Sequence, residues 1–252
     1  DITDFSTLNT FIRDKKYDFI INCAAYTAVD QAEDEKEMAG KINTDGPKNL
    51  SLAIENLNTK LIHISTDYIF DGASNIPYSE EMEAKPTGAY GITKLDGEEE
   101  IRKRGTKGII IRTSWLYSSF GNNFIKTMLR LGKEREELNV VYDQIGSPTY
   151  AGDLATAIMN IIPMLKDEHA EISHFANEGV CSWFDLAKAI FESESADCKV
   201  NPILTEQYPT KARRPHYSVF NTAKIKSTYN LSIPYWKDSL KQCIELIKKG
   251  QS

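Results

Sequence analysis

The sequence predicts an α/β fold in which helices cover both faces of a parallel sheet, followed by a smaller and mostly helical region. Several short β-branched stretches are continuous rather than alternating, which is typical of strands buried on both faces. Segments of helical periodicity lie between these stretches, and such alternation indicates a parallel sheet. From about residue 145 onward amphipathic helices dominate.

Four stretches have the composition of buried strands: "YDFIINCAA" (17–25), "TKLIHISTD" (59–67), "KGIIIRTSWLY" (107–117) and "LNVVYDQIGSPT" (138–149). Helices are expected between the first three, over residues 37–58 and 89–104. In the second helix, each glutamate of the run 98–100 precedes a basic residue of the run 102–104 by four positions. This spacing predicts exposed ion pairs along the helix. We assign these elements to a main domain over residues 1–145.

Residues 146–252 form the second predicted region. Amphipathic helices are expected within 146–162, 180–193 and 234–249, and polar or proline-bearing loops such as "YPTKARRPHYS" separate them. A helical region of this kind could close over a ligand held by the main domain. The division also leaves room for a segment that returns to the main domain.

The charge balance excludes two classes of partner. The net charge is −6, from 36 acidic and 30 basic residues, so the chain offers no general basic field for nucleic acid or for an anionic membrane. No apolar stretch approaches the ~20 residues that span a bilayer. The four cysteines, at positions 23, 181, 198 and 243, form no C-x-x-C pair and indicate neither zinc nor a disulfide scaffold. We expect a reduced, cytoplasmic protein.

Polar side chains follow the ends of three predicted strands, within residues 22–30, 65–72 and 112–124. Ligands of parallel sheets bind at these carboxyl ends. Tyr90 and Lys94 lie four apart on a predicted helix and share one face. A single Y-x-x-x-K is weak evidence in a chain with 12 tyrosines, but Ser65 and Thr66 at a strand end could converge with the pair.

This combination of side chains suggests a reduction. A nearby ammonium favours the phenolate, so we expect Lys94 to lower the pKa of Tyr90 from its usual ~10. A substrate carbonyl bound by Thr66 and Tyr90 could then receive a hydride while the phenol donates the proton.

Successive motifs resemble those of the dTDP-4-dehydrorhamnose reductases, which are extended short-chain dehydrogenases/reductases with a Rossmann-like domain. They are "INCAAYTAVDQAE", "HISTDYIFDG", "AYGITKLDGE", "IIRTSWLYSSFGNNFIKTML", "VVYDQIGSPTY", "CSWFDLAKAIF" and "RRPHYS". The resemblance runs over nearly the whole chain in the same order. It implies reduction of the 4-keto group of dTDP-6-deoxy-L-lyxo-4-hexulose to dTDP-L-rhamnose with NADPH or NADH, and it is compatible with a homodimer.

The resemblance also implies roles for individual residues. The catalytic positions match Thr66, Tyr90 and Lys94, and Asp67 matches a substrate contact. The cofactor-binding positions match Asp1, Ile2, Ala25, Tyr26 and Thr27, together with Tyr90 and Lys94. The positions that contact the dTDP-sugar match Trp115, Asn122, Asn123, Lys126 and Arg214. Arg214 is assigned to the diphosphate because a guanidinium can donate two parallel hydrogen bonds to phosphate oxygens. None of these roles requires a metal.

Simpler interpretations remain open for several of these residues. Trp115 could belong to the core. Asn122 and Asn123 could cap the helix that follows them. Arg214 could be a surface residue beside Arg213, Thr27 an ordinary turn hydroxyl, and the Asp1–Ile2 segment a frayed terminus.

One motif of the resembled family does not occur in this sequence. The glycine-rich turn G-x-x-G-x-x-G, which holds a pyrophosphate at a helix N-terminus, is not found. We expect that a first strand, its helix and a second strand precede Asp1. The residue that selects NADH or NADPH would lie there as well.

Two other functions remain as alternatives. One is a non-catalytic regulatory subunit on the same fold, such as the β subunit of methionine adenosyltransferase. The other is a sugar-nucleotide epimerase or dehydratase, although the "STD" stretch offers no glutamate beside Asp67. The intact set of Thr66, Tyr90 and Lys94 with Trp115 favours the reductase.

Overall fold

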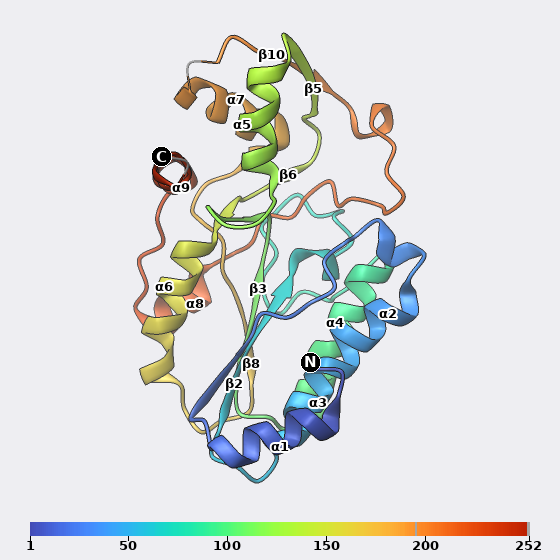
Figure 1. The fold of residues 1–252 in the computed structure, drawn as a ribbon, viewed down its shortest axis with the longest axis vertical. Helices are drawn as coiled ribbons and strands as arrows, with labels where there is room; N and C mark the ends of the chain where they lie inside the picture. Colours follow the sequence, from blue (N-terminus) through green and yellow to red (C-terminus); the bar gives the residue numbers. More distant parts are fainter. Residues whose placement is uncertain (195, 251–252) are drawn as a thin grey trace.

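A parallel sheet of four strands forms the centre of the computed structural model, which describes residues 1–194 and 196–250 (Figure 1). The strand order is β1-β2-β3-β8, and every neighbouring pair is parallel. The strands are β1 (Phe19–Asn22), β2 (Lys60–Thr66), β3 (Gly108–Thr113) and β8 (Glu171–His174). The first three confirm the predicted strands, and all six residues of β3 are buried, as a continuous apolar stretch requires.

Helices cover both faces of this sheet, as predicted. On one face, α1 (Phe5–Lys15), α3 (Gly46–Ala53) and α4 (Ala89–Lys103) pack on Leu61 and Ile110. On the other, α6 (Ala151–Ile161) and α8 (Ala223–Tyr229) pack on Ile62, Ile109 and Ile111. The alternate residues of β2 and β3 therefore supply the two halves of the core.

The helix predicted over residues 37–58 has three parts. These are α2 (Lys36–Gly40), a π-helical turn η2 (Lys41–Asp45) and α3. Such π-helical turns are rare and are frequently found at functional sites. Here the turn packs against α4. Gly97 of α4 permits this close approach, because a Cβ atom there would lie 2.1 Å from the carbonyl oxygen of Asn43.

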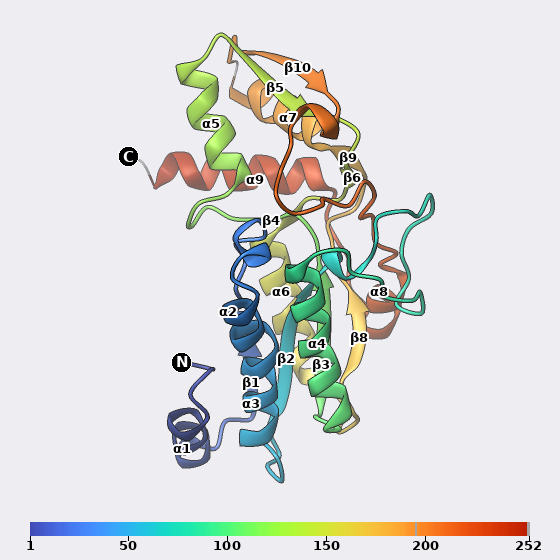
Figure 2. The ribbon, with the colours of Figure 1, turned by 90° about the vertical axis from the view of Figure 1, so that its right-hand side faces the viewer.

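A second group of elements packs at the carboxyl end of the sheet (Figure 2). It contains α5 (Phe124–Glu134), β5 (Glu137–Val141), α7 (Trp183–Glu194), β10 (Lys199–Ile203) and α9 (Trp236–Lys249). One apolar cluster unites α5, α7 and α9 around Ile125, Leu186 and Trp236. The helices α6, α7 and α9 confirm the amphipathic pattern of the second half of the chain.

The fourth predicted strand does not join the main sheet. β5 pairs with β10 in a separate two-stranded sheet and is only half buried. The fourth place in the main sheet belongs to β8, whose sequence "EISH" is too short and polar to indicate a central strand. Residues 124–141 therefore pack with elements of the second region, whereas β8 returns to the main sheet. The boundary at residue 145 stays a prediction.

The remaining elements are short. They are β4 (Leu116–Tyr117), β6 (Ile145–Gly146), β7 (Thr149–Tyr150), β9 (Cys181–Ser182) and the 3₁₀ turns η1 (Gln31–Glu33), η3 (Asp67–Ile69), η4 (Ile162–Met164) and η5 (Thr205–Gln207). β4 pairs with β7 and β6 pairs with β9, which ties the second group of elements to the end of the sheet. Within the described ranges, no helix is long and apolar enough to cross a membrane.

Candidate active site

Three ionisable side chains lie one turn apart on the face of α4 that meets the sheet: Tyr90, Lys94 and Glu98. Tyr90 is partly buried at the first turn, while Lys94 and Glu98 are 2% and 0% exposed. Gly91 lets the first turn approach η3 closely, because a Cβ atom there would lie 2.2 Å from the carbonyl oxygen of Tyr68. The pairing of Tyr90 and Lys94 on one face is confirmed.

Thr66 ends β2 and Asp67 begins the turn η3, and both lie close to Tyr90. The Thr66 hydroxyl donates to Asp67 Oδ1 at 3.0 Å and lies within hydrogen-bonding reach of the Tyr90 phenol. Burial has the largest effect on the pKa of Asp67 and raises it to about 6. The hydrogen bond from Thr66 has the opposite, smaller effect. Thr66, Asp67 and Tyr90 therefore meet at the carboxyl end of the sheet, so the predicted meeting of hydroxyl and phenol is found.

The expected effect of Lys94 on the pKa of Tyr90 is wrong for the free protein. Burial raises the pKa of Tyr90 well above its usual value, and the charge of Asp67 raises it further. Lys94 Nζ instead donates to the carbonyl oxygen of Ile64 at 2.7 Å and lies 3.4 Å from His63 Nε2. The amine of Lys94 is turned toward β2, and the phenol of Tyr90 remains protonated.

Two further expectations about this helix are wrong. Ser65 does not join the site, because its hydroxyl donates to Glu98 on the buried face of α4. Glu98 does not pair with Arg102 at the surface, since it forms a buried ion pair with Arg112 of β3. Side chains alternate along a strand, so Ser65 and Thr66 point to opposite faces. Glu100 pairs with Arg104, four positions on, as predicted, although both side chains are partly buried. Glu99 pairs with Arg102, three positions on, instead of the predicted Lys103.

The loop after β1 runs along the same end of the sheet. Asn43, buried in η2, accepts a hydrogen bond from Tyr26 N at 2.8 Å and donates to Tyr26 O at 3.1 Å. Its amide also donates to Thr93 of α4 at 3.1 Å. This amide therefore fixes the loop to the helix that carries Tyr90. Ala25 and Tyr26 are partly buried, and Thr27 is exposed.

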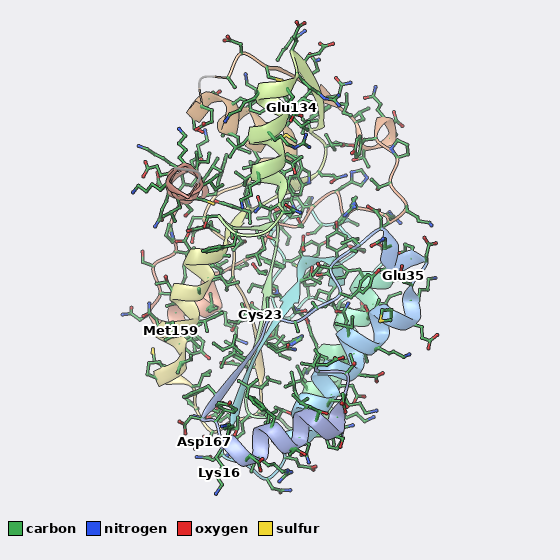
Figure 3. All side chains as sticks on the ribbon, in the orientation of Figure 1. Lys16, Cys23, Glu35, Glu134, Met159 and Asp167 are labelled. Carbon is green, nitrogen blue, oxygen red and sulfur yellow. The ribbon has the colours of Figure 1, made fainter. Side chains whose placement is uncertain are left out.

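Figure 3 shows Cys23, in the same loop, near the middle of the molecule beside the sheet. Its thiol lies close enough to Lys94 for the ammonium to lower its pKa, although burial has the larger effect and raises it. The loop thus reaches Lys94. The cofactor roles of Ala25, Tyr26 and Thr27 stay predictions.

Asp1 and Ile2 are held by the chain around them. Asp1 Oδ1 accepts from the backbone N–H of Thr3 at 2.8 Å, and the carbonyl oxygen of Ile2 accepts from Asn49 at 3.0 Å. The Ile2 side chain lies over Gly46 at the start of α3, where a Cβ atom would be 2.4 Å from Ile2 Cδ1. Their contact with a cofactor stays a prediction.

A cavity of about 870 Å³ opens among the second group of elements, with Tyr68 of η3 in its wall. Its walls include Tyr68, Trp115, Trp183 and Arg214, with apolar residues of α5 and β5. Trp115 stacks on Trp183 with ring centroids 3.7 Å apart and an interplanar angle of 9°. Trp115 has a φ of 48°, which a non-glycine residue rarely adopts. Its side chain is a cavity wall rather than an ordinary core residue.

Arg214 is the basic side chain of the cavity nearest the catalytic end. Its Nη1 donates to the Tyr68 hydroxyl at 2.8 Å, and its Nη2 forms an ion pair with Asp30. Tyr68 in turn packs edge-on against Tyr90, with ring centroids 5.4 Å apart. Arg214 is therefore half buried and positioned, in contrast to the exposed Arg213.

The structure does not place Asn122, Asn123 and Lys126 among the residues that line this cavity. Asn123 caps α5, since its Oδ1 accepts from Lys126 N at 3.2 Å. Asn122 is exposed in the preceding loop. Their contacts with a dTDP-sugar stay predictions, and capping accounts for Asn123 without a ligand.

Four residues of the site were not found from the sequence: Tyr68, Asn43, His63 and Glu98. Tyr68 lies within the quoted stretch "STDYIFDG", so its position after a strand end was the available signal. Glu98 lies four residues after Lys94, so the helical spacing was a signal for it. Asn43 and His63 act through contacts between distant segments, which no spacing along the chain indicates. In the part of the chain that the structure describes, no group of three or more metal-binding side chains occurs.

Comparisons with known proteins identify the family of this chain. A family model described as the RmlD substrate binding domain matches residues 1–249. The dTDP-4-dehydrorhamnose reductase of Sinorhizobium fredii is 41% identical over 252 residues, covering 97% of this chain and 85% of the relative. The Escherichia coli K12 protein of the same name is 41% identical over 241 residues, covering 92% and 81%.

Solved structures give the same result. A dTDP-4-dehydrorhamnose reductase from Clostridium acetobutylicum matches with a TM-score of 0.93 and 42% identity, over 98% of this chain and 87% of that one. The Bacillus anthracis enzyme, solved in complex with NADP, matches with a TM-score of 0.93 and 41% identity, over 98% and 86%. A UDP-glucuronic acid 4-epimerase from Bacillus cereus, 19% identical, shares the fold alone. The chain belongs to the dTDP-4-dehydrorhamnose reductase family of oxidoreductases.

Proposed function

We propose that this protein reduces the 4-keto group of dTDP-6-deoxy-L-lyxo-4-hexulose to give dTDP-L-rhamnose, with NADPH or NADH as the reductant. The observation that carries the proposal is the meeting of Thr66 and Tyr90 at the carboxyl end of β2, with Lys94 one helical turn from Tyr90. Tyr68 links this end to the cavity, because it packs on Tyr90 and accepts a hydrogen bond from Arg214 of the cavity wall. Relatives that bear the name of this activity are 41% identical over nearly the whole chain.

Tyr90 is the proposed acid. Because burial keeps its pKa high, the phenol carries its proton at neutral pH and can donate it to the alkoxide that forms at the sugar. Thr66, within reach of the phenol, is proposed to orient the carbonyl oxygen. Bound NADPH or NADH would supply the hydride. Asp67 is proposed to contact the substrate, and its raised pKa reflects a site with little water.

The residues at the end of the sheet fit a nicotinamide cofactor. The loop after β1 carries the small residues Ala24 and Ala25, and Asn43 holds it in a defined conformation. In its charged state Lys94 has three N–H donors. When Ile64 O and His63 Nε2 accept two of them, one remains for a ligand. We propose that this donor binds the nicotinamide ribose.

The cavity fits a nucleotide sugar. Arg214 offers a guanidinium for the diphosphate, and the stacked pair of Trp115 and Trp183 provides an apolar, planar wall. The volume of about 870 Å³ lies within the range of cavities that enclose ligands of this size. We propose that residues 146–252 with α5 and β5 form the substrate-binding region, that the protein acts in the cytoplasm, and that it can assemble as a homodimer.

A product assay tests this function. The protein is incubated with dTDP-6-deoxy-L-lyxo-4-hexulose and either NADPH or NADH, and the loss of reduced cofactor and the appearance of dTDP-L-rhamnose are followed. We expect one molecule of dTDP-L-rhamnose to appear for each molecule of reduced cofactor that is lost. Binding of cofactor and dTDP-sugar without product, by a chain whose circular dichroism shows the folded state, would contradict the proposal and favour a regulatory role.

A further inference from the structure

A buried chain of three polar side chains connects the loop after β1 to Lys94. Asn22 and His63 lie directly opposite each other on β1 and β2. Asn22 Nδ2 lies 3.0 Å from His63 Nδ1, and His63 Nε2 lies 3.4 Å from Lys94 Nζ. All three residues are at most 4% exposed. Neither Asn22 nor His63 has a role in the proposed reaction.

The direction of the Asn22 amide is set by the backbone. Its Oδ1 accepts a hydrogen bond from the N–H of Ala24 at 3.1 Å. The other end of the amide, Nδ2, therefore faces His63 and can only donate. It follows that Nδ1 of His63 accepts, and that the imidazole carries its proton on Nε2.

This tautomer is consistent with a neutral ring. Burial lowers the pKa of His63 well below its usual value, and the charge of Lys94 lowers it further whenever that amine is protonated. The imidazole is therefore neutral in both states of Lys94 and has one donor and one acceptor. Its Nε2–H points at Lys94 Nζ. An ammonium has three donors and no acceptor, whereas a neutral amine has a lone pair that can accept. The arrangement seen here therefore matches Lys94 without its extra proton.

A charged Lys94 requires a different arrangement of the same groups. The Nε2 atom must then accept from the ammonium, so the proton of His63 must sit on Nδ1. Asn22 must rotate its amide to present Oδ1 to that proton. Ala24 N–H loses its acceptor when the amide rotates, and the loop after β1 must satisfy it elsewhere.

We propose that Asn22 and His63 are positioning residues that couple the protonation of Lys94 to the hydrogen bonding of the loop after β1. When the state with neutral Lys94 changes to the state with charged Lys94, the protein takes up one proton from solvent. Lys94 becomes an ammonium, His63 stays neutral with its proton moved from Nε2 to Nδ1, and only N–H bonds change. Rotation of the amide releases one backbone donor at Ala24.

The groups around Lys94 bring both states within reach near neutral pH. Burial lowers the pKa of Lys94 to about 8, while Glu98 on the same helix and Cys23 in the loop raise it. His63 on β2 is the third ionisable group at this amine. A small change in the surroundings of the loop after β1 can then shift the equilibrium between neutral and charged Lys94. If the loop binds the cofactor, as the proposed function states, cofactor binding and proton uptake are linked.

The tautomer of His63 tests the coupling in the free protein, without substrate or activity. The full chain is labelled with ¹⁵N-histidine, and the two ring nitrogens of His63 are assigned by two-bond and three-bond couplings from about pH 6 to about pH 10. We expect Nδ1–H at the acidic end and Nε2–H at the alkaline end, with a midpoint equal to that of the Lys94 titration. A single tautomer throughout, while Lys94 titrates, would overturn the proposal.

Two variants sharpen the result. In Lys94→Met the titrating amine is gone, so the His63 tautomer should no longer change with pH. In Asn22→Asp the carboxylate can only accept, so His63 should hold its proton on Nδ1 across the range, and the pKa of Lys94 should rise. A wild-type tautomer profile in Asn22→Asp would contradict the role of Asn22. These measurements use the protein without ligands. A result that contradicts the coupling would therefore not contradict the proposed reductase activity.

Discussion

Arg112 Nη2 lies 2.6 Å from Glu98 Oε2, and both side chains are less than 5% exposed. Arg112 Nε donates to both oxygens of the same carboxylate, at 3.0 and 3.1 Å, and Ser65 donates as well. This buried pair joins α4 to β2 and β3 two turns below Tyr90. The register of the helix, and with it the positions of Tyr90 and Lys94, depends on these contacts.

Removing one partner of this ion pair should strongly destabilise the folded protein. Glu98→Ala leaves the Arg112 guanidinium buried and unpaired, so we expect the free energy of unfolding to fall by about 3–5 kcal/mol. Urea unfolding measures it. The control is Glu99→Ala, whose pair with Arg102 is exposed and should contribute less than about 1 kcal/mol. Equal losses in the two variants would contradict the structural role of Glu98.

Lys94→Met should weaken cofactor binding and lower turnover together, because the same ammonium is proposed to bind the nicotinamide ribose and to act beside Tyr90. In the wild type, the affinity for NADPH should fall as the pH rises through about 8, where Lys94 loses its charge. Calorimetric titrations across this range measure both effects. A variant that binds NADPH with wild-type affinity at every pH would contradict the ribose contact.

Arg214→Lys keeps the charge but loses the planar fork that a diphosphate requires. We expect the KM for the dTDP-sugar to rise about tenfold or more, with the KM for NADPH unchanged. The matched control is Arg213→Lys, at an exposed neighbouring position. If both substrates were affected equally, Arg214 would not contact the diphosphate.

Asp67 should make the protein less stable as the pH rises. Its pKa is about 6 in the folded state against 3.8 for an ordinary aspartate, so the folded state binds the proton more tightly. That stabilisation is present below about pH 4 and is lost as the pH rises through about 6. At ~1.4 kcal/mol per pKa unit, the loss amounts to about 3 kcal/mol.

Asp67→Asn lacks this ionisation and serves as the reference. The free energy of unfolding of the wild type, relative to that of the variant, should therefore decrease between about pH 4 and about pH 7. Chemical denaturation at several pH values measures the difference. A constant difference over this range would mean that Asp67 has an ordinary pKa.

Local sequence patterns predicted the central strands and the helix faces, because these depend on interactions between residues close in the chain. The apolar stretches around Ile62 and Ile110 gave the central strands, and the four-residue spacing placed Tyr90 and Lys94 on one helix face. Patterns failed where distant segments decide the outcome. β8 is too short and polar to be found alone, and the burial of Glu98 depends on Arg112 from another strand. The resemblance supplied Trp115 and Arg214 as candidates, which the structure places in the cavity wall.

The central claim is that the Tyr90 phenol donates the proton in a hydride reduction. Tyr90→Phe removes only the hydroxyl, so the ring contact with Tyr68 and the fold should persist. With dTDP-6-deoxy-L-lyxo-4-hexulose and NADPH, we expect turnover to fall by ~10²-fold or more, with little change in the dissociation constant of NADPH. Near-normal turnover by this variant would contradict the account.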